Sequence, residues 1–296
     1  MSRNQTPLTI SMIEIVRNFQ TSFGMNLKIM RSLYGLRSLE VYPDEKSPLA
    51  MVVDGIQAPL SIHPDGEIAH SSFLENKYDI GKVDFFASAI NRFGREVCLL
   101  DIGANIGLFS RQLASKTSLI KKAVLYEPHP ENFVHLKRNL TLWKANTHFV
   151  NAALSDVSGK LEFYEDPGNC GNYSLNMAAM PPNMTRITVD VLDARLEMEN
   201  WLSLRLPIIY KSDTQGFDEK IASLLPVEFW SSVRVACFEL WRIAKPDFDH
   251  YMFAKVLDSF PNKAFDSAPS TPVEAPQIFD YLTGTDGHYK DLLLWR

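Results

Sequence analysis

The sequence predicts an α/β fold in which a mostly parallel sheet carries helices on both faces. From residue 95 on, apolar runs typical of buried strands alternate with segments whose apolar residues recur at helical spacing. The strand-like runs VCLLDIG, KAVLYEP and THFVNAAL are separated by the helix-like segments NIGLFSRQLASK and PENFVHLKRNLTLW. The chain has 296 residues, 46% of them hydrophobic, which suffices for one such domain and an appendage.

Residues 1–94 are predicted to form a separate N-terminal extension, a lid or an oligomerisation element. Apolar side chains recur every three or four residues within 8–33, which predicts an amphipathic helix with Arg17, Lys28 and Arg31 on its other face. Such a helix packs on its own domain or on a second subunit, as in a homodimer, or contacts an anionic membrane peripherally. Between residues 49 and 70, Asp-Gly and Pro-Asp-Gly turns predict small antiparallel strands.

Residues 95–296 are predicted to form the main domain. Beyond the first strands, PIIYKSDTQG and VRVACFELW predict two further strands, and FDEKIASLLPVEFW predicts one helix between them. The terminal DLLLWR predicts a last strand, antiparallel and at the edge of the sheet. The expected fold is therefore a mostly parallel sheet with an antiparallel last strand and a small N-terminal α+β extension.

Composition bounds the partners and the compartment. The net charge of −5 gives no general reason to expect nucleic acid, so a small molecule or glycan is favoured. Cys98, Cys170 and Cys237 are too far apart for a Cys-x-x-Cys metal pair or a disulfide framework, which makes a reducing compartment the default. No run of about 18 apolar residues predicts a membrane span or a signal for secretion, so the cytoplasm is expected.

The segment LLDIGANIGLFS (99–110) predicts a strand that ends in a glycine turn and opens a helix. Such a turn presents backbone N–H groups and the positive end of the helix dipole to an anion. The dinucleotide pattern G-x-G-x-x-G needs a glycine where this chain has Asn105, and its third glycine is missing, so a pyrophosphate and a nicotinamide dehydrogenase are disfavoured. A single carboxylate suits the turn better, and Asp101 can accept from an ammonium group.

A second acid, Glu127, ends the next strand-like run. Its distance from Asp101 is near the offset, about 20 residues, at which an acid reaches ribose hydroxyls. Pro128 after it ends the strand and fixes the helix entry. An amino-acid head group joined to a ribose indicates S-adenosylmethionine.

Six segments follow one another between residues ~95 and 245: DIGANIG, YEPHPENFVHLKRN, NAALSD, GNYSLN, ITVDVLD and YKSDTQGFDEKI. In sequence and in order they resemble the FkbM family of S-adenosylmethionine-dependent methyltransferases. The resemblance implies a Rossmann-like class I methyltransferase sheet. It assigns the methionine end of the cofactor to Asp101, Gly103, Ala104, Asn105 and Gly107, the ribose to Glu127 and Pro128, and the adenine to Asn151, Ala152 and Ala153.

Three residues are the candidates for catalysis. Asp213 follows a predicted strand at the end where ligands bind in open α/β sheets, so it either contacts the acceptor as a general base or caps the next helix. Lys211 either lowers the pKa of an acceptor hydroxyl or points away into a surface pair. His70, with Phe73 and Tyr78, can close over the substrate if the extension covers the cofactor mouth.

The family usually carries an acid two residues after that aspartate, whereas this chain has Gln215. Glutamine cannot act as a base and is a poorer ligand for a hard cation, which disfavours a metal-assisted reaction, so no metal ligands are assigned and a water-rich Mg²⁺ site is the alternative left open. Glu239, at the end of the next strand, can face the same crevice. His129 and His135, in the second helix, are expected to be solvated.

The expected function is methyl transfer from S-adenosylmethionine to a hydroxyl. The resemblance implies sugars, glycans or polyketide-type natural products as acceptors, with N-methylation of an amino sugar still open. The alternative is a catalytically inactive cofactor-binding module that serves a partner in glycan or natural-product assembly, for which Gln215 is the sequence support.

Overall fold

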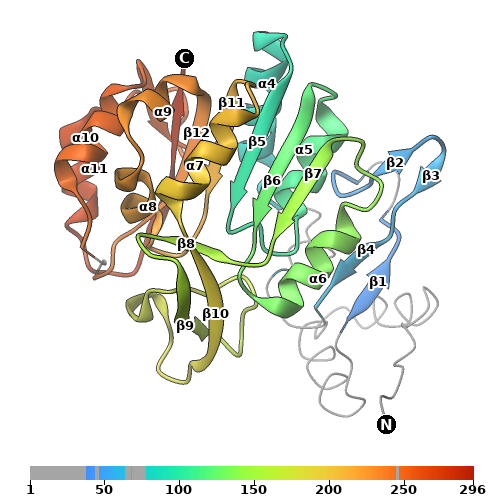
Figure 1. Cartoon of the computed structure of the whole chain (residues 1–296), viewed down its shortest axis with the longest axis horizontal. Helices are drawn as coiled ribbons and strands as arrows, with labels where there is room; N and C mark the ends of the chain where they lie inside the picture. The colour runs from blue at the N-terminus through green and yellow to red at the C-terminus, as the bar shows by residue number, and fades with distance from the viewer. Residues whose placement is uncertain (1–37, 44–46, 64–67, 69–77, 245–246) are drawn as a thin grey trace.

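A seven-stranded sheet forms the centre of the computed structural model (Figure 1), which describes residues 38–43, 47–63, 68, 78–244 and 247–296. Its strand order is β13-β14-β12-β11-β5-β6-β7. In chain order these strands are β5 (Val97–Ile102), β6 (Ile120–Tyr126), β7 (Asn146–Val150), β11 (Ile208–Ser212), β12 (Val233–Trp241), β13 (Asn262–Phe265) and β14 (Tyr289–Trp295).

Five of the strands are parallel, and the strand order reverses between β5 and β11. β6 and β7 follow on one side of β5, and β12 follows on the other side of β11. β14 runs antiparallel to both β12 and β13. This topology confirms the predicted Rossmann-like sheet, mostly parallel with an antiparallel last strand. The expected edge position of the last strand was wrong, because β13 pairs with β14 and lies outside it.

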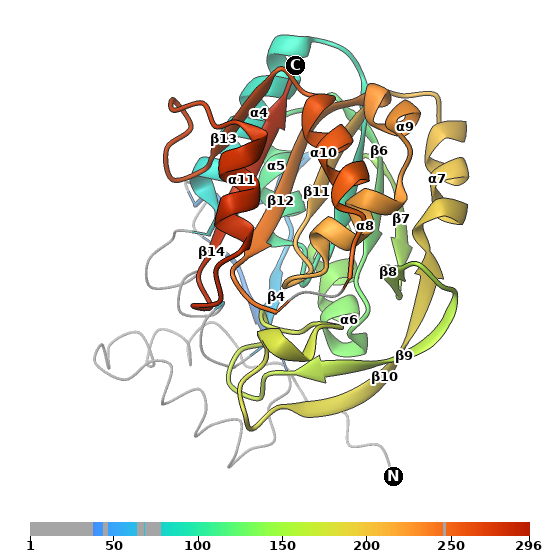
Figure 2. The same ribbon diagram turned by 90° about the vertical axis from the view of Figure 1, so that its left-hand side faces the viewer.

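Helices cover both faces of the sheet. The central strand β5 is therefore buried along its whole length, and its side chains alternate between two cores. Leu99 faces the core that contains α4 (Ile80–Phe93), α5 (Leu108–Lys116) and α6 (Pro130–Asn139). Leu100 faces the core of α7 (Ala194–Ser203), α8 (Asp218–Leu224), α9 (Val227–Ser232), α10 (His250–Asp258) and α11 (Ala275–Leu282). Figure 2 shows this second layer of helices in front of the sheet.

The predicted helix after β11 is two short helices. α8 ends at Leu224 and α9 begins at Val227, with Pro226 at the N-cap of α9. Proline lacks the backbone N–H that a helix interior needs, so the helix is interrupted at this point. The helical spacing of the apolar side chains continues across the interruption, which is why the sequence predicted a single helix.

A smaller three-stranded sheet lies beyond the carboxyl ends of the parallel strands. β10 (Thr185–Asp193) pairs antiparallel with β9 (Gly159–Glu165) and parallel with β8 (Ala153–Ser155). The 3₁₀ helix η1 (Met177–Ala179) lies between β9 and β10 in the chain. In Figure 1 the arrowheads of β5, β6 and β7 point toward this sheet, which places it over the edge where ligands bind.

The N-terminal extension contains the expected antiparallel strands. β1 (Leu39–Val41) pairs with β4 (Leu60–Ile62), and β2 (Val52–Val53) pairs with β3 (Ile56–Gln57). Asp54 and Gly55 have φ of 52° and 77°, the left-handed conformation that two-residue hairpins need. The predicted helix over 8–33, His70 and Phe73 lie outside the described residues, and the boundary at residue 94 stays a prediction.

His129 and His135 are buried, so the expectation that they are solvated was wrong. Their exposed fractions are 5% and 3%. His135 and His63 also connect the extension to α6. His135 Nδ1 lies 2.8 Å from Ser61 Oγ, and His63 Nε2 lies 2.7 Å from Asn132 Oδ1. Burial, with the neighbouring charge of His63, lowers the pKa of His135 to about 3, so the ring is neutral and serves as a packing and hydrogen-bonding group.

Two further expectations concern cysteines and membranes. Cys98, Cys170 and Cys237 are free and buried. Among the described residues, no helix combines the length and the apolar character that crossing a membrane requires.

Candidate active site

A cavity of about 520 Å³ opens at the carboxyl ends of β5, β6, β11 and β12, at the point where the strand order reverses. Ligands of open α/β sheets bind at this point because two loops diverge there and leave a crevice. The small sheet contributes to the wall with Leu154 and Phe163, and α4 contributes with Lys82. The volume is typical of sites for small molecules.

The glycine turn after β5 depends on its glycines for two close approaches. Gly103 has φ +73°, and a Cβ there would lie 1.9 Å from the backbone oxygen of Asp213. Gly107 has φ +82°, and a Cβ there would lie 2.7 Å from Leu136 Cδ1. Any side chain at position 103 would push β5 and the loop after β11 apart, so this glycine sets the width of the cavity floor.

The backbone amides of the turn are engaged within the protein, which corrects the expectation that they face a ligand. Gly103 N and Ala104 N donate to Tyr126 O, Gly107 N donates to Ala104 O, and Asn105 N donates to Glu127 Oε2 at 2.7 Å. The first amides without an intrahelical acceptor are those of Leu108, Phe109 and Ser110 in the first turn of α5. An anion bound here would therefore meet the helix start and the Asn105 side chain.

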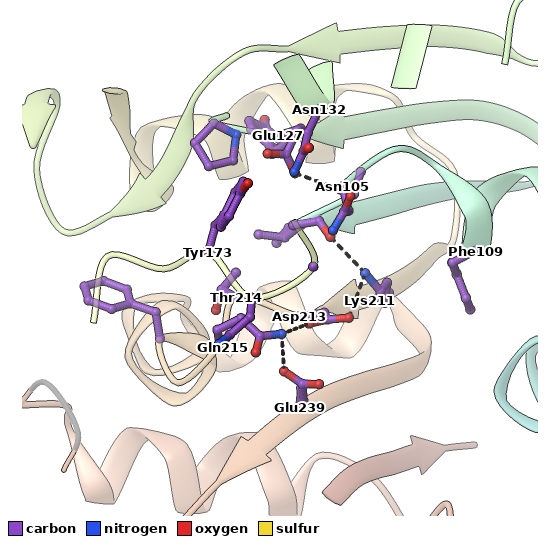
Figure 3. A pocket seen from close by; sticks show the side chains of 18 of the residues that line it. Asn105, Phe109, Glu127, Asn132, Tyr173, Lys211, Asp213, Thr214, Gln215 and Glu239 are labelled. Carbon is purple, nitrogen blue, oxygen red and sulfur yellow. Dashed lines mark hydrogen bonds and ion pairs between the residues drawn. The ribbon is translucent and has the colours of Figure 1, made fainter. Parts of the chain in front are cut away.

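Glu127 sits at the end of β6 with both carboxylate oxygens held by backbone donors. Oε2 accepts from Asn105 N, and Oε1 accepts from His129 N at 2.8 Å. Burial raises the pKa of Glu127 to about 7, although these hydrogen bonds oppose the shift. The residue lines the cavity beside Pro128, and its oxygens keep lone pairs that can accept from hydroxyl groups. Figure 3 shows Glu127 and Asn105 on the same wall.

The predicted adenine residues divide into two groups. Ala152 and Ala153 line the cavity next to Leu154 and Phe163, where they form an apolar slot. Asn151 is exposed and lies outside the lining, and its Nδ2 donates to Glu127 O at 2.7 Å and to Pro128 O at 3.0 Å. Its side chain thus fixes the backbone of the Glu127–Pro128 corner.

Asp101 lies behind the cavity wall with a fully buried carboxylate. Its Oδ2 accepts from Ser110 Oγ at 2.6 Å, and its Oδ1 lies 3.2 Å from Lys211 Nζ. The two residues are register partners on β5 and β11. Asp101 therefore positions Lys211 and the start of α5, and it does not line the cavity.

Lys211 points into the site and away from the surface, which decides between the two orientations left open by the sequence. Its Nζ donates to Gly103 O at 3.0 Å and lies 3.5 Å from Asp213 Oδ2. Burial alone would lower the pKa of Lys211, but Asp101 and Asp213 raise it above its ordinary value. Lys211 is therefore charged, and it cannot serve as a base.

Asp213 faces the cavity and caps no helix. The N-cap of α8 is Phe217, which makes no side-chain capping hydrogen bond. The Asp213 side chain is 18% exposed, whereas those of Lys211 and Asp101 are 4% and 0% exposed. Burial alone would raise the pKa of Asp213, but Lys211 and Lys82 lower it, so this carboxylate is ionised.

Gln215 links Asp213 to Glu239. Its Nε2 donates to Asp213 Oδ1 at 2.9 Å and to Glu239 Oε2 at 2.7 Å, as Figure 3 shows. The amide thus occupies the place at which a third acid would meet these two. Among the described residues, no group of three or more His, Cys, Asp or Glu side chains is placed to hold a metal ion.

The structure adds residues to this end of the cavity that sequence reasoning missed. Asp79, Lys82 and Asp291 line it from α4 and β14, with Lys82 Nζ 2.7 Å from Asp291 Oδ2. Trp241 and Tyr289 also line it, and their stacked rings have centroids 5.0 Å apart. The one available sequence signal was the DLLLWR strand, because an antiparallel partner of β12 places Asp291 directly opposite Glu239.

No family model matches the sequence, and no curated protein matches it. Similar solved structures include an S-adenosylmethionine-dependent methyltransferase from Agrobacterium tumefaciens, at 10% identity and TM-score 0.39, over 82% of this chain and 68% of that chain. Another is the geranyl diphosphate C-methyltransferase of Streptomyces coelicolor A3(2), crystallised with Mg²⁺, a geranyl thiolodiphosphate and S-adenosylhomocysteine, at 10% identity and TM-score 0.37, over 98% of both chains. A third is an S-adenosylmethionine-dependent methyltransferase from Leishmania major, at 14% identity and TM-score 0.32, over 76% of both chains. The FkbM family is thus not shown, and the fold assignment rests on the strand order.

Proposed function

We propose that the chain binds S-adenosylmethionine in this cavity and transfers its methyl group to an acceptor hydroxyl, with Asp213 as general base, as expected of an FkbM-like methyltransferase. The observation that carries the proposal is the Asp213 carboxylate, ionised beside Lys211 and open to the cavity where the strand order reverses. An ionised acid at that point can accept the proton that an attacking hydroxyl loses.

The donor half of the cavity fits an aminoacyl nucleoside. Glu127 supplies acceptors for two ribose hydroxyls, and the slot at Ala152, Ala153 and Phe163 offers apolar walls for a flat base. Thr214 and Asn172 line the cavity, and each carries a buried side-chain oxygen without a hydrogen-bond partner among the described residues.

Catalysis needs few groups from the protein, because the donor supplies a methyl group already activated on a positively charged sulfur. Asp213 orients the hydroxyl and takes its proton while the O–CH₃ bond forms and the S–CH₃ bond breaks. Lys211 keeps Asp213 ionised before the reaction. Leu154 and Phe163 of the small sheet and Ile68 of the extension line the cavity.

The acceptor half favours a hydroxyl-rich acceptor without phosphate or carboxylate groups, such as a sugar, a glycan or a polyketide-type product. Asp79, Asp266 and Asp291 contribute carboxylates there, and Lys82 and Lys211, the lysines of the lining among the described residues, already pair with acids. The stacked pair of Trp241 and Tyr289 offers apolar ring faces beside these acceptors. Carboxylates accept hydrogen bonds from hydroxyls and repel anions.

Glu127→Ala is expected to weaken S-adenosylmethionine binding by about 10- to 100-fold, because the site loses hydrogen bonds to a charged acceptor. Isothermal titration calorimetry with S-adenosylmethionine, S-adenosylhomocysteine and NAD measures this loss. The matched control is Glu162→Ala, an exposed glutamate on β9 outside the cavity. Binding of NAD in preference to both methionine-derived ligands, or of none of the three by the folded protein, contradicts the proposal.

Cofactor affinity is expected to rise as the pH increases through about 7, because the carboxylate form of Glu127 accepts ribose hydroxyls and burial raises its pKa to that value. The same shift has the opposite sign for stability. The folded chain binds this proton more tightly than the unfolded chain, so the stabilisation is full below the ordinary glutamate pKa and is lost as the pH rises toward 7. Calorimetry across this range should give a flat profile for Glu127→Gln. A wild-type profile equally flat would refute the assignment.

A screen for turnover distinguishes the enzyme from the inactive module. Formation of S-adenosylhomocysteine is measured with neutral sugars, glycans, hydroxylated macrolides and amino sugars, each paired with the analogue that lacks the hydroxyl or amine. Transfer to a hydroxyl supports O-methylation. Tight binding of S-adenosylmethionine with no turnover on any member favours the cofactor-binding module.

A further inference from the structure

Glu239 is a buried acid of the cavity to which the proposed reaction assigns no role. It lies near the carboxyl end of β12 with an exposed fraction of 6% and lines the acceptor half. Its Oε2 accepts from Trp241 Nε1 at 2.6 Å and from Gln215 Nε2 at 2.7 Å. Both donors are neutral, so neither compensates a full negative charge on this carboxyl.

The charges around Glu239 come from three elements and are mostly negative. Asp213 follows β11. Asp291 on β14 is the direct cross-strand partner of Glu239. Lys82 on α4 is the nearby cation, but its Nζ lies 2.7 Å from Asp291 Oδ2 and 3.3 Å from Asp79 Oδ2. Like charges directly opposite each other on paired strands repel. The Lys82 ammonium group already pairs with Asp79 and Asp291, so it compensates the charge of Glu239 only weakly. Glu239 also interacts electrostatically with Tyr281 and Tyr289. Both tyrosines are neutral at neutral pH, because burial raises the pKa of each to about 12.

Asp213 and Glu239 share one amide donor, which brings the two carboxyl groups together. Ionising both would place two negative charges on either side of Gln215 Nε2. Burial first, and then Asp213 and Asp291, raise the pKa of Glu239 well above its ordinary value. A hydrogen bond from Glu239 is among the interactions that lower the pKa of Asp213, together with the two lysines. The proton of this pair therefore resides on Glu239.

We propose that Glu239 is a positioning residue that carries a proton at neutral pH and donates a hydrogen bond through it to Asp213, so that Asp213 stays ionised and aimed at the acceptor. During transfer the acceptor proton goes to Asp213, and Glu239 keeps its own. The catalytic part rests on the proposed function, whereas the proton on Glu239 exists with or without cofactor and acceptor.

Infrared difference spectroscopy on the ligand-free chain tests the proton directly. At pH about 8.5 the wild type should show a carboxylic-acid C=O band that Glu239→Gln lacks, because Glu127 and Asp218, whose pKa values are raised to about 7, are then mostly ionised. Glu162→Gln, an exposed control, should retain the band. A wild-type spectrum identical to that of Glu239→Gln would show an ionised Glu239 and overturn the proposal.

One measurement needs no variant, and it keeps the inference testable if Glu239→Gln folds poorly. A pH titration of the wild-type band alone should show an acid that stays protonated after the others ionise, and loss of all bands by pH about 8 would refute it. Once an acceptor is known, Glu239→Ala should reduce transfer by about tenfold, and Glu239→Gln should recover most of that loss because its amide still donates to Asp213. Absence of cofactor binding would reject the proposed function and leave the infrared result standing.

Discussion

Asp213→Asn is expected to reduce methyl transfer by about 10²–10⁴-fold, the usual contribution of a general base. The amide has the same shape, and its oxygen can still accept from Gln215, but it cannot take a proton. Lys211 keeps Asp101 at 3.2 Å and Gly103 O at 3.0 Å, so the strand ends remain tied and the variant should fold. Because Asp213 does not contact Glu127 or the apolar slot, cofactor affinity should stay within about threefold of wild type.

The measurement combines single-turnover formation of S-adenosylhomocysteine on an acceptor from the screen with calorimetry for the cofactor. Asp266→Asn is the matched control, since it makes the same chemical change at an exposed aspartate of the same cavity. A rate loss of equal size in both variants would point to the charge of the cavity rather than to proton transfer. Full activity of Asp213→Asn would show that the acceptor needs no base at this position.

The order of the main elements could be predicted because each signal is local. Apolar runs of strand length, helical spacing and glycine or proline punctuation all act within a few residues, and they gave the parallel strands and most of the helices. The split at Pro226 was visible in the sequence, but the side-chain pattern carried across it. The edge position of β14 failed because β13 is only four residues long, too short for a clear alternation.

Site residues that directly follow a predicted strand could be predicted from the sequence. Residues that reach the cavity only through tertiary packing could not. Asp213, Glu127 and the glycine turn follow predicted strands and therefore reach the carboxyl edge. Asp101 also reaches that edge, but its side chain turns inward to Ser110 and Lys211, which spacing cannot reveal. Lys82 and Asp291 lie far from these residues in the chain and reach the cavity through the packing of α4 and the pairing of β14.

The buried histidines show the same limit for the extension. His135 lies on α6 and was expected to be solvated, yet β4 contacts it through Ser61. Neither residue carries a local signal of this contact, because the covering strand is 74 residues away in the chain. Contacts between the extension and the main domain therefore had to come from the structure.

Arg111→Met is expected to destabilise the protein by about 3–5 kcal/mol, as when one partner of a buried charged network is removed. Arg111 on α5 is fully buried. Its guanidinium donates to four backbone carbonyls, those of Leu49 at 2.7 Å, Ala58 at 2.7 Å, Pro59 at 2.9 Å and Asn139 at 2.9 Å. Burial lowers the pKa of Arg111 to about 10, so the group is still charged at neutral pH.

The loss is large because methionine fills the space of the aliphatic stem but leaves four buried carbonyls without donors. Three of them belong to residues 49–59 of the extension and the fourth ends α6, so Arg111 is the point at which the extension is held to both helices. Urea unfolding measures the free energy, and hydrogen exchange at residues 49–59 shows whether the extension opens before the main domain. Arg138→Met is the control, since that side chain is half-exposed and lies 3.9 Å from Glu40, and it should change stability by no more than about 0.5 kcal/mol. A loss below about 1 kcal/mol in Arg111→Met, with unchanged exchange, would mean that the extension is held by its apolar contacts and by the Ser61–Asn139 pair instead.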